Sequence, residues 1–353
     1  MSLILGIESS CDETAAAVVE NGFEVRSSVI ASQIAVHAPL GGVVPELAAR
    51  EHLKALNPVV SSALEQAGVT LREIDAVAVT QGPGLIPALL VGLNYAKGLA
   101  SGHGKPLIGV NHFMAHIYGA FLDGGSDALA DKNSYPLLAL VVSGGHTALV
   151  LVNENGEARQ LGCTIDDAAG EALDKGAKLL GLPYPGGPAI QRTAEKGDPE
   201  AFDFPRPLTG AAGKALAPEN LYNFSFSGIK TALLYHLRNR DVSDPGMLAD
   251  TAASYQRAVV DCLVRKTLKA AKDFSVRTVV VAGGVACNAE LRRMMAEKMP
   301  AKIALRIARP VFCTDNAAMV AGIAWHNFRR GEFSALDIDS FARLPQFVKV
   351  PFI

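Results

Sequence analysis

Alternating apolar and polar segments predict that the chain is built from two halves on one plan. Leu3–Ile7 and Thr14–Val19 are apolar runs of strand length on either side of a polar turn, a pattern typical of a β-hairpin. Leu137–Val142 and Ala148–Val152 repeat this design around a turn that contains two glycines. A repeat of this length indicates two α/β halves of like topology.

Two further pairs of segments, each a strand followed by a helix, extend the repeat. In the first pair Ala76–Thr80 leads to Ala88–Leu99 and Val279–Ala282 leads to Asn288–Met299; in the second Leu107–Val110 leads to a helix from His112 and Ile303–Ile307 to a helix from Asp315. These pairs are spaced roughly 65 residues further apart than the hairpins, which predicts a helical insertion in the second half at about 166–245.

The length of 353 residues exceeds what one hydrophobic core usually supports. We expect an N-terminal α/β domain at residues 1–128 and a C-terminal α/β domain at 129–353, joined by a polar linker near 124–134. Each half opens with a hairpin whose tip faces the other half. Such an architecture forms a cleft suited to a nucleotide.

Composition narrows the class of protein. Hydrophobic residues make up 49% of the chain and charged residues 19%, values of a globular protein. The apolar stretches are shorter than the ~18 residues of a membrane helix, and the first residues lack the basic region of a signal peptide. The five cysteines are widely spaced and odd in number, so neither a disulfide framework nor a thiolate zinc site is indicated. We therefore expect a soluble, cytoplasmic protein with reduced thiols and no membrane partner.

Two histidines are candidates for metal binding. His112 and His116 stand four residues apart, on one face of a helix and within reach of one ion; the alternative is that both only pack or cap the helix. The repeat brings Asp315 across the cleft to them, unless Asp315 only caps its own helix. Two imidazoles and one carboxylate form a site with open positions, suited to iron or zinc. Because Phe113–Ala115 supplies no general base between the histidines, a metalloprotease is disfavoured.

The turn between the second pair of hairpin strands is a candidate phosphate site. It contains Ser143, Gly144, Gly145 and His146. Backbone N–H groups of glycines can converge on an anion, and the flanking hydroxyls add donors. An ordinary hairpin turn is the alternative.

Four further positions in the second half are candidates for nucleotide binding. Gly283 and Gly284 end a strand just before Asn288, an arrangement in which a flat base can lie on glycine backbone. Asp174 lies within the predicted helix at 166–180. A surface ion pair is the default role for Asp174, and ribose binding is the alternative.

Nine motifs together resemble those of the TsaD family (YgjD, Gcp). They run in order along nearly the whole chain: Gly6–Thr14, Gly41–Ala48, His112–His116, Val142–Thr147, Asp166–Glu171, Tyr184–Pro188, Phe224–Gly228, Ala282–Val285 and Cys313–Asn316. The resemblance implies the actin-like ATPase (ASKHA) fold, with two duplicated α/β domains around a nucleotide cleft. It also implies transfer of a threonylcarbamoyl group from threonylcarbamoyl-AMP to N6 of adenosine 37 in tRNAs that read codons beginning with A.

The resemblance also implies roles for individual residues. His112, His116 and Asp315 would hold one divalent metal ion, Fe²⁺ in preference to Zn²⁺. Asp12 and Glu13, which in isolation form only an acidic hairpin tip, would face the reacting centre. Further residues would hold the donor of the threonylcarbamoyl group. They combine the positions that match the family with the glycine positions described above: Val141, Val142, Ser143, Gly144, Gly145, His146, Asp174, Gly187, Gly283, Gly284 and Asn288.

Charge bears on the partners. The formal net charge is −2, so the chain lacks the basic signature of a protein that binds nucleic acid unaided. The resemblance implies help from a TsaB-like paralogue and a TsaE-like ATPase in binding tRNA. The competing hypothesis is an actin-like-fold kinase or ATPase that acts on a small molecule, but such an enzyme builds its Mg²⁺ site on carboxylates rather than on histidines.

Overall fold

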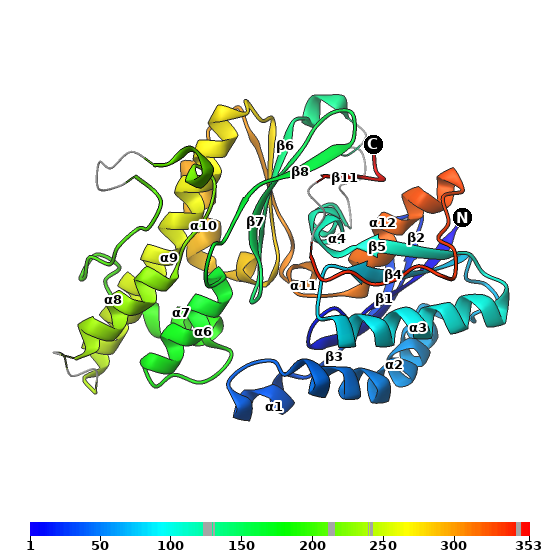
Figure 1. The fold of residues 1–353 in the computed structure, drawn as a ribbon, viewed down its shortest axis with the longest axis horizontal. Coiled ribbons are helices and arrows are strands. Elements are labelled where there is room, and N and C mark those ends of the chain that lie inside the picture. The colour runs from blue at the N-terminus through cyan, green and yellow to red at the C-terminus, as the bar shows by residue number, and fades with distance from the viewer. Residues whose placement is uncertain (123–128, 130, 211–215, 239, 241–242, 344–346) are drawn as a thin grey trace. The chain divides into compact units, whose positions relative to one another are not determined.

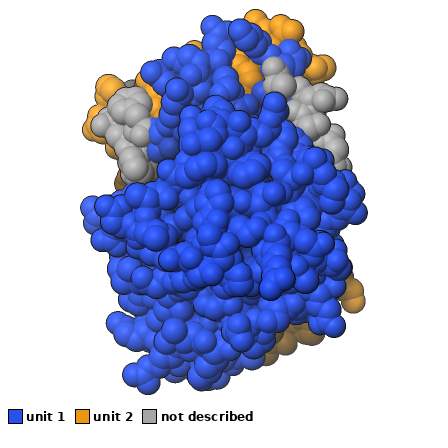
Figure 2. Space-filling view, turned by 90° about the vertical axis from the view of Figure 1, so that its right-hand side faces the viewer, with its two compact units in different colours: residues 1–132, 154–157, 311–353 blue, residues 133–153, 158–310 orange. Residues whose placement is uncertain are grey.

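The chain folds into two compact units, each built around one β-sheet. The structure is a computed structural model and describes residues 1–122, 129, 131–210, 216–238, 240, 243–343 and 347–353. Unit 1 comprises residues 1–132, 154–157 and 311–353, and unit 2 comprises residues 133–153 and 158–310 (Figure 2). The expected mixed α/β class is confirmed (Figure 1).

Unit 1 contains a sheet with the strand order β3-β2-β1-β4-β5. Strands β1 to β3 pair antiparallel, whereas β4 and β5 continue the sheet parallel to β1. The strands are β1 Leu3–Glu8, β2 Glu13–Glu20, β3 Glu24–Ser32, β4 Ala76–Gly82 and β5 Leu107–Asn111. The helices are α1 Ile34–His37, α2 Pro45–Ala67, α3 Ile86–His103, α4 His112–Gly119 and α12 Ala317–Arg330, and a short strand β11 covers Phe347–Lys349.

Strand β1 separates two layers of helices because successive side chains of a strand point to opposite faces. Leu5 and Ile7 belong to the core cluster that the sheet forms with α2 and α3. Gly6 faces the other way, and a Cβ there would lie 2.3 Å from the backbone oxygen of Ala317 at the start of α12. Glycine at this position therefore allows α12 to pack directly on the sheet. Glu8 shares the face of Gly6 and so points toward the layer that contains α12.

Unit 2 repeats the plan with the strand order β10-β9-β6-β7-β8. Strands β6 to β8 form an antiparallel meander, and β9 and β10 extend it in parallel from β6. The strands are β6 Leu137–Val142, β7 Thr147–Val152, β8 Glu157–Cys163, β9 Thr278–Ala282 and β10 Ala304–Ile307. The helices are α6 Ala169–Leu179, α7 Gly186–Ala194, α8 Ser227–Leu237, α9 Pro245–Asp273 and α10 Ala289–Lys298. The short helix α11, Pro310–Cys313, begins at the last residue of unit 2 and continues in unit 1.

The compact units differ from the expected domain ranges at the C-terminal end. Residues 311–353 belong to unit 1, because α12 packs on β1, β2 and β4 and against α4. Asp315 therefore lies in the same unit as the histidines and does not reach them across a cleft. Residues 124–128 and 130 of the expected linker lie outside the described residues, as do residues 211–215, 239, 241 and 242 of the expected insertion. Helices α6, α7 and α8 occupy described parts of that insertion.

The structure bears on two expectations about the class of protein, namely the state of the cysteines and the presence of membrane-spanning helices. Each of the five cysteines is a free thiol. Within the described residues, none of the helices combines the length and the apolar composition that a membrane crossing requires.

Candidate active site

Helix α4 presents its two histidines to the interior of unit 1. Asn111 caps this helix by accepting a hydrogen bond from the backbone N–H of Met114 at 3.2 Å. The cap starts the helix at His112, so His112 and His116 lie one turn apart on one face. Both imidazoles are buried.

Asp315 completes a group of three potential metal ligands. Its Oδ1 lies 3.0 Å from Nε2 of His116 and 3.6 Å from Nε2 of His112, and the two Nε2 atoms are 3.2 Å apart. An ion with bonds of about 2.1 Å holds its ligand atoms about 3.0–3.4 Å apart in octahedral or tetrahedral geometry. Two of the three separations lie in this range and the third, 3.6 Å, slightly exceeds it, so the three atoms approximate one face of a coordination polyhedron. The other positions remain for water or substrate. This donor set suits iron or zinc.

Asp315 is not the cap of the helix that follows it. The N-cap of α12 is Asn316, whose side chain accepts a hydrogen bond from Met319 N–H at 3.0 Å. The alternative role considered for Asp315 is therefore taken by its neighbour. The carboxylate of Asp315 points instead to the histidines.

Glu8 is a component of this site that the sequence interpretation missed. It is completely buried, and its Oε2 lies 3.1 Å from Nδ1 of His112. Thr80 Oγ1 donates to the same oxygen at 2.5 Å, and Ser10 N–H donates to Oε1 at 2.5 Å. A carboxylate behind a histidine ligand is a common way to orient metal-binding imidazoles.

The carboxylates change the protonation of His112. Burial alone would lower the pKa of His112, but the negative charges of Glu8 and Asp315 raise it to about 9. Burial likewise opposes ionisation of Glu8, yet the positive charge of His112 keeps the pKa of Glu8 below its usual value. Without a metal ion the site thus holds an imidazolium between two carboxylates. A divalent cation would replace that positive charge.

The acidic turn between β1 and β2 is held by its backbone carbonyls. The carbonyl of Ser10 accepts from Leu85 N–H at 2.8 Å, that of Cys11 from His52 Nε2–H at 3.0 Å, and that of Asp12 from Gln33 N–H at 3.0 Å. Thr14 Oγ1 lies 2.7 Å from Nδ1 of the same histidine, His52. These contacts fix the path of the chain through Asp12 and Glu13.

The same turn lies in the electrostatic field of Asp315. Burial, with the negative charges of Asp315 and Asp12, raises the pKa of Glu13 to about 10. Burial and the charges of Asp12 and Asp315 also raise the pKa of the Cys11 thiol. The turn therefore lies close enough to the candidate metal ligands for its acidic side chains to interact electrostatically with Asp315.

In unit 2 the turn from Ser143 to His146 is a closed hairpin turn with an open outer side. Ser143 N–H donates to the carbonyl of His146 at 2.8 Å, and His146 N–H donates to Ser143 Oγ at 3.2 Å. Gly144 and Gly145 are exposed, and a Cβ on either would meet no atom within 4 Å. The side chains of Val141 and Val142 are buried in β6. A ligand could therefore contact these valines only through their backbone atoms.

One hydrogen bond links Asp174 to Gly186, the residue before Gly187. The carboxylate of Asp174 on α6 accepts from Gly186 N–H at 2.6 Å. This contact fixes the first residues of α7, where Gly187 follows. The structure thus shows Asp174 in a positioning contact, and its proposed role with ribose remains a prediction.

Gly283 and Asn288 have local structural roles. Gly283 has φ +95°, and a Cβ there would lie 2.4 Å from the carbonyl oxygen of Val142. Gly284 then opens a short 3₁₀ turn that ends at Cys287. Asn288 caps α10 by accepting from Leu291 N–H at 3.0 Å, and its amide donates to Gln256 at 2.8 Å. These contacts hold the turn that follows β9, the segment where the sequence predicted that a flat base can lie on glycine backbone.

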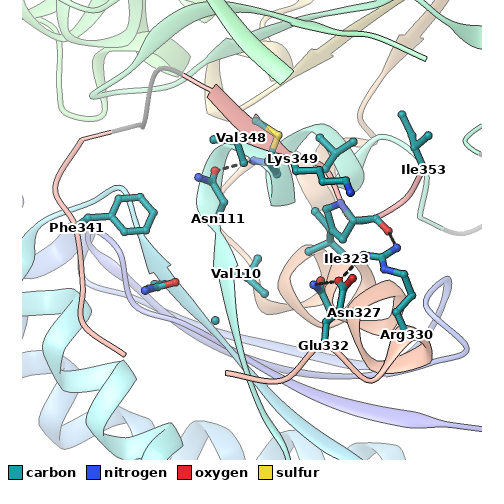
Figure 3. A pocket seen from close by; sticks show the side chains of 15 residues that line it. Val110, Asn111, Ile323, Asn327, Arg330, Glu332, Phe341, Val348, Lys349 and Ile353 are labelled. Carbon is teal, nitrogen blue, oxygen red and sulfur yellow. Dashed lines mark hydrogen bonds and ion pairs between the residues drawn. The ribbon is translucent and has the colours of Figure 1, made fainter. Parts of the chain in front are cut away.

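A pocket of about 430 Å³ lies elsewhere in unit 1. Its lining includes Val110 and Asn111 of β5 together with the C-terminal segment, and Arg330 and Glu332 form an ion pair at 2.9 Å on its wall (Figure 3). None of the candidate metal or catalytic residues lines it. We therefore do not assign the predicted chemistry to this pocket.

Solved structures identify the class of fold. The chain is similar to HypF of T. kodakarensis with a TM-score of 0.59 and 15% identity, over 94% of this chain and 48% of that one. It is also similar to the activator of the 2-hydroxyisocaproyl-CoA dehydratase from Clostridium difficile, with a TM-score of 0.52 and 15% identity over 94% and 100% of the two chains. These similarities confirm the actin-like ATPase fold.

Sequence comparison then identifies the family. The family described as TsaD, tRNA N6-adenosine threonylcarbamoyltransferase, matches residues 24–322. Relatives with this name are 50% identical in Geobacter sp. (strain M21), over 97% of this chain and 96% of that protein, and 51% identical in Symbiobacterium thermophilum, over 96% and 95%. The chain belongs to the TsaD family, a family of transferases that act on tRNA. Neither the kinase nor the metalloprotease alternative is favoured.

Proposed function

We propose that this chain transfers the threonylcarbamoyl group of threonylcarbamoyl-AMP to N6 of adenosine 37 in tRNAs that read codons beginning with A. The proposal is carried by the group formed by His112, His116 and Asp315 next to an acidic turn, in a chain of this family. In the reaction a C–N bond forms between N6 and the carbamoyl carbon. The C–O bond to the phosphate breaks, and AMP leaves with the bonding electron pair.

His112, His116 and Asp315 would hold one divalent ion, and we favour Fe²⁺ over Zn²⁺. The spacing of their ligand atoms and their mixed imidazole and carboxylate character support this assignment. When bound, such an ion supplies Lewis acidity and an anchor for substrate oxygens. The chain's own residues then have to place the acceptor base and remove its proton.

Asp12 and Glu13 are our candidates for work on the acceptor amine. An exocyclic adenine amine is a weak nucleophile, so a carboxylate that accepts its proton as the C–N bond forms lowers the barrier. The raised pKa of Glu13 suits a group that donates a hydrogen bond, which leaves Asp12 as the proton acceptor. The base must leave its stack to reach this turn, as in other enzymes that modify a nucleobase.

Unit 2 would bind the donor. We assign the phosphate to the exposed Gly144–Gly145 backbone, because N–H groups of a glycine turn can approach an anion closely. The adenosine would contact the glycine strand end at Gly283–Gly284 and the region of Asn288. Asp174 would meet the ribose and at the same time hold the start of α7.

Partner proteins complete the proposal. A net charge of −2 gives little general attraction to a polyanion. We propose that a TsaB-like paralogue and a TsaE-like ATPase assist tRNA binding and turnover, and that the reaction takes place in the cytoplasm.

Mass spectrometry of tRNA nucleosides tests the proposal directly. Unmodified tRNA is incubated with threonylcarbamoyl-AMP and the partner proteins, with and without this chain. We expect threonylcarbamoyl-adenosine only when the chain is present. The isosteric changes Asp12→Asn and Glu13→Gln separate the two carboxylates, because loss of a general base typically costs about 10²–10⁴-fold in rate. Full transfer by both variants would remove the carboxylates from the mechanism, and absence of product with the unchanged chain would overturn the assignment.

A further inference from the structure

Three hydrogen-bond donors converge on the buried carboxylate of Glu8. Ser10 N–H reaches Oε1, whereas Thr80 Oγ1 and Nδ1 of His112 both reach Oε2. The side chain is 0% exposed, and it lies on the face of β1 that Gly6 opens to α12. A buried carboxylate with this many donors is fixed in position.

The contact with Glu8 determines which nitrogen of His112 is available for a metal ion. An ionised carboxylate only accepts hydrogen bonds, so the proton of His112 must be on Nδ1. The lone pair of the neutral ring is then on Nε2, the atom that lies 3.2 Å from Nε2 of His116 and 3.6 Å from Asp315. We propose that Glu8 is a positioning residue that selects this tautomer of His112 and holds the ring for metal binding. This inference rests on the metal site of the proposed function.

The second histidine lacks a comparable support among the described residues. Nδ1 of His116 is buried and has no hydrogen-bond partner there. The orientation of His116 therefore depends on packing within α4 and on its Nε2 contacts. Among the described residues, His112 therefore has a carboxylate at its Nδ1 and His116 does not. Glu8, a residue of β1, thus links the orientation of His112 to the sheet.

The change Glu8→Gln tests the tautomer, because an amide replaces one accepting carboxylate oxygen with an NH₂ group that only donates. An NH₂ group in the place of Oε1 would meet the Ser10 N–H that now approaches at 2.5 Å. The amide therefore places its NH₂ group toward Thr80 and His112. Thr80 can rotate its hydroxyl to accept, but Nδ1 of His112 must also become an acceptor for the amide. The Ser10 hydroxyl, 3.4 Å from Nδ1, can then donate to that nitrogen as well. The ring proton then moves to Nε2 and blocks the metal-binding lone pair.

Metal affinity of the full chain is the direct measurement. The protein is stripped with a chelator and titrated with Zn²⁺ or Co²⁺ in competition with a chromophoric chelator. We expect Glu8→Gln to bind about 10–100-fold more weakly, the usual cost of losing an outer partner of a metal ligand. Glu20→Gln is the matched control, because Glu20 is a buried carboxylate of the same hairpin that pairs with Arg26 rather than with the site. The control should bind like the unchanged protein.

A second measurement keeps the inference testable if Glu8→Gln does not fold. In the zinc-loaded unchanged protein, ¹⁵N NMR of labelled histidines should show a protected proton on Nδ1 of His112 and a metal-shifted Nε2. Zinc on Nδ1 would overturn the inference, as would equal affinities of Glu8→Gln and the unchanged protein. If the unchanged protein binds neither metal, the metal site itself fails, and the role of Glu8 fails with it.

Discussion

Two adjacent residues, Asp315 and Asn316, should have separable effects on metal binding and on stability. Asp315 directs its carboxylate to the histidines, whereas Asn316 caps α12. We compare Asp315→Ala with Asn316→Ala. The pair is informative because the two positions share one backbone and differ in what their side chains contact.

The cost of Asn316→Ala follows from its contacts. Asn316 is 0% exposed, accepts from Met319 N–H at 3.0 Å and donates to the carbonyl of Thr314 at 2.9 Å. Loss of an N-cap typically costs about 1 kcal/mol, and an unsatisfied buried carbonyl costs about 1–3 kcal/mol. We therefore expect the free energy of unfolding to fall by about 2–4 kcal/mol, with one metal ion per chain retained.

Asp315→Ala should show the reverse pattern. The attraction of Asp315 to His112 opposes its repulsion of Glu8 and Glu13, so we expect the stability of the metal-free protein to change by less than about 1 kcal/mol. Metal affinity should fall by more than the about 10–100-fold that outer partners cost. Stabilisation by added metal, about 2.7 kcal/mol for the unchanged protein at 100 times the dissociation constant, should disappear.

Urea unfolding and elemental analysis give the two readouts. Both variants are measured after chelator treatment and again after reloading with Zn²⁺. The reasoning is refuted if Asp315→Ala keeps its metal, or if Asn316→Ala loses metal while its stability is unchanged.

Three further predictions concern the protonation of the metal site and the structure of unit 2. Because the pKa of metal-free His112 is about 9, metal binding must displace a proton, and the apparent affinity for Co²⁺ should rise between pH 6 and pH 8.5; calorimetry in buffers of different ionisation enthalpy should detect the released proton, and a flat profile would contradict the assignment. Asp174→Ala removes the acceptor of Gly186 N–H and should weaken binding of an AMP analogue while metal content stays constant; equal loss of both would mean that α6 is only structural. Gly283→Ala places a Cβ against the Val142 carbonyl at positive φ and should destabilise the protein by about 1–3 kcal/mol in urea unfolding, whereas Gly144→Ala, with open space around it, should change stability by less than about 0.5 kcal/mol.

The hairpins and the strand-to-helix units were predictable because their signals are local. The apolar runs at 137–142 and 148–152 correspond to β6 and β7, and the helix expected from Asn288 begins at Ala289 with Asn288 as its cap. Turn and cap residues leave a mark in the sequence next to the element that they end. The repeat of these units predicted two α/β halves of like topology, and the family resemblance implied the actin-like fold, which agrees with that repeat.

The place of Asp315 was only half predictable. The repeat pairs its helix with α4, but it also suggested that the helix belongs to the second half. Packing decides otherwise, because the small residues Gly6 and Ala317 let α12 lie directly on β1. Contact of this kind depends on which surfaces fit in three dimensions, and the order of segments along the chain does not encode it.

Glu8 could not be found from local signals. In the sequence it is one of several acids around a polar turn, and its partners Thr80 and His112 are 72 and 104 residues away. One clue was present: Glu8 is two residues after Gly6, and alternation along a strand places both on the same face. An acid on the interior face of a buried strand requires partners.

The topology of unit 1 also affects how the protein is made. The chain leaves unit 1 at residue 132, and apart from residues 154–157 it returns only at residue 311. Asp315 is 199 residues from His116, so a growing polypeptide on the ribosome exposes both histidines long before their third partner is synthesised. Contacts between such distant segments form late in folding. The face of β1 that α12 covers therefore stays uncovered during most of translation. Binding of a metal ion by all three ligands can occur only when most of the chain has emerged.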